Sequence, residues 1–172
     1  MREGIVLSIC AALVACGGSS SSTEAFHANM TSAQEIPTPT VGTPTPTGTA
    51  VFTNNNDGTV SYQVTGSNMT ATATGVNPAV TYTGMHIHLA ASGQTAPVTV
   101  PLTTPTNGSS SFNVTGTFTS ATCSGSQVNC INTGKTIDDV LTAMRSGGAY
   151  INVHTSKNPQ GELRGQIATG AQ

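Results

Sequence analysis

Charge is scarce in this 172-residue chain: Asp, Glu, Lys and Arg together make up 7% of it, and Trp is absent. Only five residues are Lys or Arg, so no basic stripe exists and nucleic acid is excluded as a predicted partner. The formal net charge of −2 also argues against disorder, which combines low hydrophobicity with high net charge. Ser, Thr, Asn and Gly replace the charged residues, and Ser and Thr between apolar positions are typical of β-sheet surfaces. The composition therefore predicts one folded domain that is rich in β-strands.

Long apolar runs are missing too. The run at residues 5–15 is shorter than the roughly 20 residues that a membrane-spanning helix needs. It follows charged Arg2 and Glu3 and ends in small residues, which is typical of a secretory signal peptide. Leu13-Val14-Ala15-Cys16 resembles the bacterial lipobox, in which the cysteine is acylated and the chain is cut just before it. The alternative is an ordinary signal peptide followed by a chance cysteine.

The lipobox resemblance implies a signal peptide over residues 1–15 and a lipidated Cys16. Gly and Ser dominate the segment that follows, so residues 16–25 are predicted to be a flexible tether. The acylated cysteine would make a lipid membrane one partner of the protein. The predicted location is the cell envelope, outside the cytoplasm, either in the periplasm or on the outer surface.

Cysteine is nearly absent from the predicted mature domain. Cys10 would leave with the signal peptide and Cys16 would be lipidated, which leaves Cys123 and Cys130. An even pair in an exported domain predicts a disulfide. A metal site with two thiolates is the alternative, although zinc sites normally have four ligands at closer spacing.

The motifs of common enzymes are also missing. The chain has no Gly-x-Ser-x-Gly elbow and no glycine-rich loop of the kind that binds phosphate. Its few acidic residues leave little material for a hydrolase with paired carboxylates. Glu162 and Arg164 stand two residues apart on one predicted strand face and are interpreted as a cross-strand ion pair.

What the chain does contain is a series of short segments in which apolar and polar residues alternate. They predict strands at residues 26–31, 48–53, 60–65, 81–89, 98–102, 111–119, 149–154 and 162–168. Residues 54–58 end in Asp57-Gly58 and predict a hairpin turn. The proline-rich residues 36–48 are predicted to be an extended surface segment, since proline cannot donate to a strand ladder.

One helix is predicted at about residues 136–146. Thr136 is a good N-cap, and Asp138 and Asp139 fall in the first turn, where the helix dipole favours them. An apolar stripe follows at helical spacing, and Gly147 ends the helix. The predicted fold is all-β: an immunoglobulin-like or Greek-key β-sandwich or barrel with one short helix.

Three of the four histidines lie in two of the predicted strands, residues 81–89 and 149–154. Strand alternation places His86 and His88 on one face together with Tyr82, opposite the apolar residues of that strand. His154 likewise lies on the polar face of the second strand. If these strands are neighbours, three imidazoles converge, and such a set suits copper or zinc.

Two interpretations of these histidines stay open. They are either a metal site, with copper as the predicted ion, or hydrogen-bonded residues with a surface or structural role. The clustering of three of the four histidines in two short segments favours the metal site, because the rest of the chain is poor in ionisable groups. Additional ligands from the first strand, His27 or Met30, would indicate metal storage or transfer.

Residues 26–169 resemble a CHRD domain, a repeat first named in chordin and also present in microbial proteins. The motifs that carry the resemblance are Ser32-Ala33-Gln34-Glu35-Ile36-Pro37, Met85-His86-Ile87-His88, Pro101-Leu102, and two runs at residues 149–155 and 158–166. Leu89 departs from the family pattern, in which Gly-Pro often follows the histidine pair, and the loop with Cys123 and Cys130 looks like an insertion. The resemblance implies an extracytoplasmic, immunoglobulin-like β fold and no particular activity.

A weaker resemblance is to Cu/Zn superoxide dismutase, itself a Greek-key β structure. It is carried by Gly-x-His-x-His on one strand, then Val-His and Gly-x-x-Arg. It implies that His86, His88 and His154 are copper ligands and that Arg164 guides an anionic substrate. The bridging histidine, the zinc-site aspartate and matching cysteines are missing, so the resemblance implies a copper-only or vestigial site.

The sequence as a whole predicts a membrane-tethered, extracytoplasmic CHRD-domain binding module that binds copper through three histidines. Enzymatic activity is left open and is not favoured. The alternative is a copper enzyme of the superoxide dismutase type, with Arg164 in the catalytic site. The protein or small molecule that such a module binds is left open.

Overall fold

The computed structural model describes residues 23–70 and 79–170. The predicted signal peptide, Cys16 and the first part of the predicted tether lie outside these residues. The strands are β1 Glu24–Thr31, β2 Thr47–Asn54, β3 Thr59–Ser67, β4 Tyr82–His88, β5 Val98–Pro101, β6 Phe112–Thr119, β7 Tyr150–Thr155, β8 Leu163–Gln166 and β9 Ala168–Thr169. The helices are the 3-10 turn η1 Ser32–Gln34 and the α-helix α1 Ile137–Arg145.

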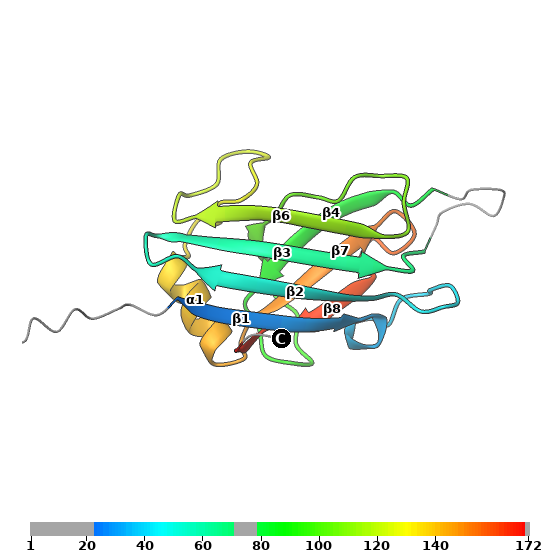
Figure 1. Ribbon diagram of the computed structural model, residues 1–172, viewed down its shortest axis with the longest axis horizontal. Helices are drawn as coiled ribbons and strands as arrows, with labels where there is room; N and C mark the ends of the chain where they lie inside the picture. Colours follow the sequence, from blue (N-terminus) through cyan, green and yellow to red (C-terminus); the bar gives the residue numbers. More distant parts are fainter. Residues whose placement is uncertain (1–22, 71–78, 171–172) are drawn as a thin grey trace, which may run out of the picture.

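The strands form one antiparallel sheet in the order β5-β4-β7-β8-β1-β2-β3-β6, with β9 paired to β1. Figure 1 shows that β6, β3, β2 and β1 form a front layer, behind which β4, β7 and β8 cross at an angle. The front layer is paired along its full length, whereas β1 and β8 share only the pair Thr31–Arg164. The molecule is therefore an almost closed antiparallel barrel flattened into a sandwich, which confirms the predicted all-β class.

The hairpin of β2 and β3 shows how local sequence sets the front layer. Asn56 and Gly58 take positive φ in the turn, and the Asp57 carboxylate accepts hydrogen bonds from Thr59. Beyond the turn the strands alternate, so that Phe52 and Val60 are fully buried between the layers. Burial of one such side chain contributes about 1.5–3 kcal/mol, so this alternation holds the two layers together.

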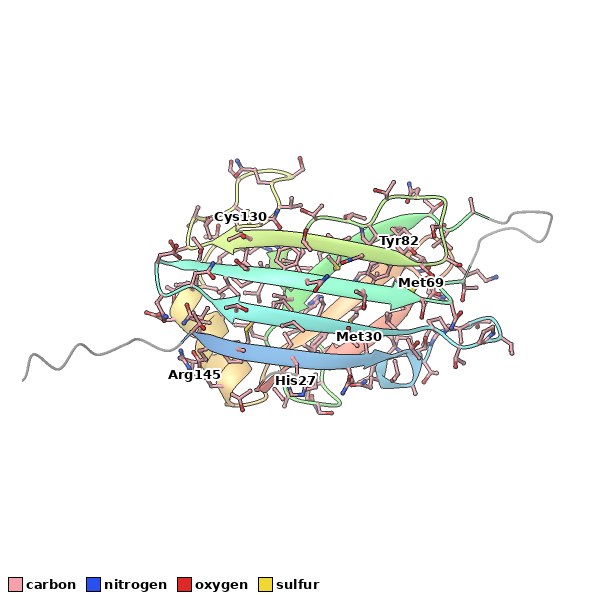
Figure 2. All side chains as sticks on the ribbon, in the orientation of Figure 1. His27, Met30, Met69, Tyr82, Cys130 and Arg145 are labelled. Carbon is pink, nitrogen blue, oxygen red and sulfur yellow. A yellow bond between two sulfur atoms is a disulfide. The ribbon has the colours of Figure 1, made fainter. Side chains whose placement is uncertain are left out.

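The helix α1 is where the sequence predicted it and packs at one end of the barrel (Figure 1). Thr136 and Asp139 form a reciprocal capping box. Val140, Leu141 and Met144 are buried in the core. Arg145 forms a bidentate ion pair with Glu24, and Figure 2 shows it beside the start of β1.

The gap between the two edge strands, β5 and β6, is bridged by the loop of residues 120–132. Thr119 donates to the carbonyl of Asn129, and Asn129 in turn donates to the carbonyl of Pro101 in β5. Cys123 and Cys130 are joined by a disulfide across this loop, with 5.1 Å between their Cα atoms. The predicted disulfide is thus confirmed, and the alternative of a two-thiolate metal site is excluded because both sulfurs are bonded.

Two local predictions need correction. The tether was expected to continue to residue 25, but β1 begins at Glu24, where pairing with Asn54 and the ion pair with Arg145 hold the chain. Tyr82 was expected on the histidine face of its strand. It lies in the core instead, with its ring edge-on to Phe112, because β4 is irregular between Tyr82 and Gly84. Tyr82 pairs with Thr155 and Gly84 with His154, so β4 has one residue more than β7 at this point, and the alternation before it is reversed.

Candidate metal centre

The two histidine strands are neighbours, as the metal-site prediction requires. β4 and β7 pair antiparallel, with Gly84 opposite His154 and His86 opposite Asn152. Residues of the same face on paired strands have neighbouring side chains. His154 therefore lies diagonally across from His86, and all three imidazoles share the outward face of the rear layer.

His86, His88 and His154 converge so closely that one ring nitrogen of each lies within 4.8 Å of the others. The ring centroid of His86 lies 5.8 Å from that of His88 and 5.0 Å from that of His154. This is the one group of three or more His, Cys, Asp or Glu that could hold a metal within residues 23–70 and 79–170. The structure thus brings together all three predicted ligands.

The two predicted additional ligands do not join this cluster. His27 lies on β1 in the front layer (Figure 2), where its Nδ1 is 3.2 Å from the carbonyl oxygen of Gly170. Met30 is buried in the core between the layers. Neither side chain therefore lies on the outward face of β4, where the three histidines gather.

Hydrogen bonds fix the orientation of two of the three rings. The Nδ1 of His88 lies 2.8 Å from the carbonyl of Ala96, and that of His154 lies 3.0 Å from the carbonyl of Pro159. Because a carbonyl only accepts, each Nδ1 carries the proton and each Nε2 keeps its lone pair. Both Nε2 atoms, and Nδ1 of His86, are buried without a hydrogen-bond partner. Metal-binding histidines typically have this arrangement, with one nitrogen anchored and the other free.

Burial keeps all three imidazoles neutral at neutral pH. Burial, together with the nearby imidazoles of His154 and His88, lowers the pKa of His86 to about 4. Burial also lowers the pKa of His88 and of His154, although each gains an opposing hydrogen bond to a backbone carbonyl. A metal ion binds only the neutral imidazole, so these nitrogens need not lose a proton to become ligands.

Glycine at position 84 makes room for the centre. A Cβ at Gly84 would lie 2.6 Å from Cε1 and 2.9 Å from Nε2 of His86. The ring of His86 therefore lies directly over the backbone of Gly84, in space that any larger residue would fill. The Gly-x-His-x-His pattern has a steric reason as well as a chemical one.

A family model for the CHRD domain matches residues 26–167, most of the chain. The chain belongs to the CHRD family. The match covers the three clustered histidines, Arg164 and the loop with the disulfide. No curated protein and no solved structure matches the chain. Among the residues that the structure describes, no helix is long and apolar enough to cross a membrane.

Arg164 of this CHRD domain does not form the expected ion pair with Glu162. The Glu162 carboxylate is fully buried and accepts hydrogen bonds from Thr155, Asn158 and the backbone N–H of Thr70. Glu162 immediately precedes β8, where the chain departs from strand alternation, so its side chain turns away from Arg164. In the described part of the chain the one ion pair is Arg145–Glu24.

Arg164 instead belongs to a stack of side chains beside the histidines. Its guanidinium carbon lies 3.6 Å from the ring centroid of Tyr150, and its Nη2 donates to the carbonyl of Gln94 at 2.7 Å. Tyr150 in turn stacks on His88, with centroids 4.7 Å apart and an angle of 4° between the rings. Arg164 is only 2% exposed, so it does not face solvent as an anion-guiding arginine would.

Sequence reasoning missed a role for Glu35, which it used only as part of the family motif. The Glu35 carboxyl group is 3% exposed, and Asn152 donates to its Oε2 at 3.2 Å. Its Oε1 and the Oδ1 of Asn152 have no partner. Burial raises the pKa of Glu35 to about 7, although the nearby positive charge of Arg164 opposes this. The motif residue was visible in the sequence, but its proximity to Asn152 depends on the fold.

Proposed function

We propose that this CHRD domain binds one copper ion through His86, His88 and His154, as an extracytoplasmic binding module tethered to a membrane through acylated Cys16. One observation carries the copper site: three ring nitrogens lie within 4.8 Å of each other, each in a histidine with a buried nitrogen that has no partner. A buried polar atom without a hydrogen bond costs about 1–3 kcal/mol. A bound ion would remove that cost at all three positions together.

Copper is favoured over other ions by the donor set. Three imidazoles without a carboxylate exclude the hard ions Mg²⁺ and Ca²⁺, which prefer oxygen. Imidazole suits both copper and zinc, and Cu²⁺ binds more tightly than Zn²⁺ at a given site of this kind. A structural zinc site would add a fourth protein ligand, and the cluster offers three.

The location outside the cytoplasm is supported by the disulfide. Disulfides persist in exported proteins and are rare in the reducing cytoplasm. The apolar run at residues 5–15 and the lipobox-like sequence before Cys16 supply the export signal and the acylation site. The described domain begins close behind, at residue 23, so a short tether would hold it near the membrane surface.

The alternative, a copper enzyme of the superoxide dismutase type, rests on the same histidines and on Arg164. It requires an arginine that meets a small anion at an open copper position. Arg164 is buried, bound to Gln94 and stacked on Tyr150. The geometry therefore favours a binding module over this enzyme.

The copper site is tested by loading the purified, metal-free full chain with copper, removing unbound ion and measuring metal per chain. We expect one copper in the wild type. His86→Ala and His154→Ala should lose more affinity than the roughly 10–100-fold that loss of an outer-shell partner costs. His27→Ala is the matched control, because His27 lies outside the cluster. Equal loading of all four proteins, or no loading of any, would refute the site.

Acylation is tested separately by the mass and membrane fraction of the native protein. Wild type should carry acyl mass on residue 16, and Cys16→Ala should yield an uncleaved or unlipidated chain. Cys10→Ala is the control, because Cys10 lies within the predicted signal peptide and should leave with it. A native protein that is fully soluble and carries no acyl group would contradict the tether.

A further inference from the structure

A buried cation stands next to the three histidines, separated from them by one aromatic ring. β7 lies between β4 and β8 in the sheet, so His88 and Arg164 approach Tyr150 from opposite sides. The spacing is tight on both sides, with 4.7 Å between the rings of His88 and Tyr150 and 3.6 Å between Arg164 and the Tyr150 ring. The hydrogen bond to Gln94 holds the guanidinium in place. Its charge is thus a fixed part of the environment of His88.

No anionic ligand balances this charge within the cluster. The candidate ligands are three imidazoles, and no described Asp, Glu or Cys lies among them. The Glu162 carboxylate is turned toward Thr155 and Asn158. Glu35 interacts with Arg164, but burial holds its pKa at about 7, so it is only partly ionised at neutral pH. An ion at the centre would therefore sit near a net positive charge.

Burial of the centre also disfavours a divalent ion relative to a monovalent one. The three ring nitrogens without partners are each shielded from solvent. The cost of moving an ion out of water grows with the square of its charge, so a divalent ion loses more solvation there than a monovalent one. Coordination number points the same way, because Cu(II) prefers a tetragonal set of ligands, whereas Cu(I) accepts three.

We propose that the three-histidine centre selects Cu(I) over Cu(II), and that Arg164, acting through Tyr150 on His88, sets this preference. The inference rests on the proposed copper site and adds the oxidation state of its ion. Arg164 is here a positioning and charge-setting residue rather than a ligand. Its positive charge repels Cu(II) more strongly than Cu(I), and the stack transmits that effect to one ligand ring.

The preference is measured by two competition titrations on the purified full chain. One uses a Cu(I)-specific chelator without oxygen and with ascorbate, and the other uses a Cu(II) chelator in air. Wild type should bind Cu(I) more tightly than Cu(II) by at least about tenfold, which for a one-electron couple corresponds to about 59 mV. Tighter binding of Cu(II) would overturn the inference and leave the copper site intact. Failure to bind either ion would overturn the copper site itself.

The role of Arg164 is tested in an E35Q background, so that Glu35 cannot take up a proton when the neighbouring charge is removed. Adding R164Q should lower the ratio of Cu(I) to Cu(II) affinity about tenfold, or about 59 mV. Adding R164K, which keeps the charge, should change the ratio much less, and this comparison separates charge from folding. Equal ratios in the R164Q and R164K proteins would overturn the role assigned to Arg164.

Discussion

The two layers of the barrel differ in how far their outward faces are buried. In the front layer, β3 alternates regularly between buried and more exposed residues, and its outward hydroxyls pair across strands, as in Thr49–Thr65 and Ser61–Thr117. In the rear layer, five of the six residues of β7 are buried and the sixth, His154, is partly buried. The inward face is apolar in both layers, so the difference lies in what covers the outside.

Loops cover the outward face of the rear layer, and each makes a specific hydrogen bond to it. Ala96 accepts from His88, Gln94 from Arg164 and Pro159 from His154, and Glu35 accepts from Asn152. A hydroxyl on an open face is satisfied by water or by its neighbour across the strand. A covered face leaves lone pairs without water, which shifts pKa values and makes imidazoles available to a metal. This difference explains why the candidate site lies in the rear layer.

The contrast is tested most directly by truncating one polar side chain that is buried beside the rear layer and one that is exposed on the front layer. Glu162→Ala should destabilise the protein by about 3–5 kcal/mol, because an unsatisfied buried donor costs about 1–3 kcal/mol, and two buried donors and one partly buried donor would lose their acceptor. Gln63→Ala, on the exposed face of β3, should stay within about 0.5 kcal/mol. Urea unfolding gives both values. Comparable losses would show that the loops do not protect the rear face.

Acid should weaken the metal-free protein through the covered histidines. Folded His86 takes up a proton only near pH 4, whereas in the unfolded chain it does so near 6.5. Between these values unfolding takes up protons, so stability falls as the pH falls, by about 3 kcal/mol for His86. His88 and His154, whose pKa values are also lowered, should add to this loss. Urea unfolding from pH 7 to 4 measures the effect, and His86→Gln should reduce it.

Glu35 should act in the opposite direction over much of the same range. Its carboxyl group keeps a proton up to about pH 7 in the folded protein but only to 4.5 when unfolded. Unfolding therefore releases a proton between these values, and stability falls as the pH rises, by about 3 kcal/mol in total. Glu35→Gln should remove this component and expose the full histidine effect. An unchanged pH profile in that variant would show that Glu35 is ionised throughout.

The sequence could predict what depends on alternation and local capping. The strands, the hairpin turn at Asp57-Gly58 and the helix after Thr136 follow from patterns within a few residues, and the structure confirms them. The shared face of His86 and His88 follows from the same alternation. Their proximity to His154 needed the pairing of β4 with β7, which is long-range and had to be assumed.

Errors occurred where a local pattern met an irregularity or a distant loop. Tyr82 changes face because β4 is irregular before Gly84, and nothing in the alternation signals it. Glu162 and Arg164 were paired by their spacing, although Glu162 binds Thr155 and Arg164 stacks on Tyr150. Glu35 was overlooked because a carboxyl group far away in sequence gives no sign that a fold will bury it. Burial by loops is the component that alternation cannot predict.

The smallest effect on stability is expected at the loop of residues 120–132, which bridges the edge strands β6 and β5 and is called the seam below. The disulfide spans seven positions, from Cys123 to Cys130, and so closes a short loop. The chain-entropy model then gives it about 2–3 kcal/mol. Replacing both cysteines by Ala should lower stability by that amount, because the loop that bridges β6 and β5 gains freedom when unfolded. Intact mass with and without reduction first establishes that the bond is present in the protein.

The same variant also tests whether the seam supports the histidine centre. β5 pairs with β4 at the position of His86, so a loosened seam could reach the site. However, β4 also pairs with β7 at six positions, on the side away from the seam, and β7 carries His154. We therefore expect copper affinity to change by less than about threefold, or about 0.7 kcal/mol. A loss of copper binding equal to that in His86→Ala would mean that the disulfide holds the centre together and that the two layers are not independent.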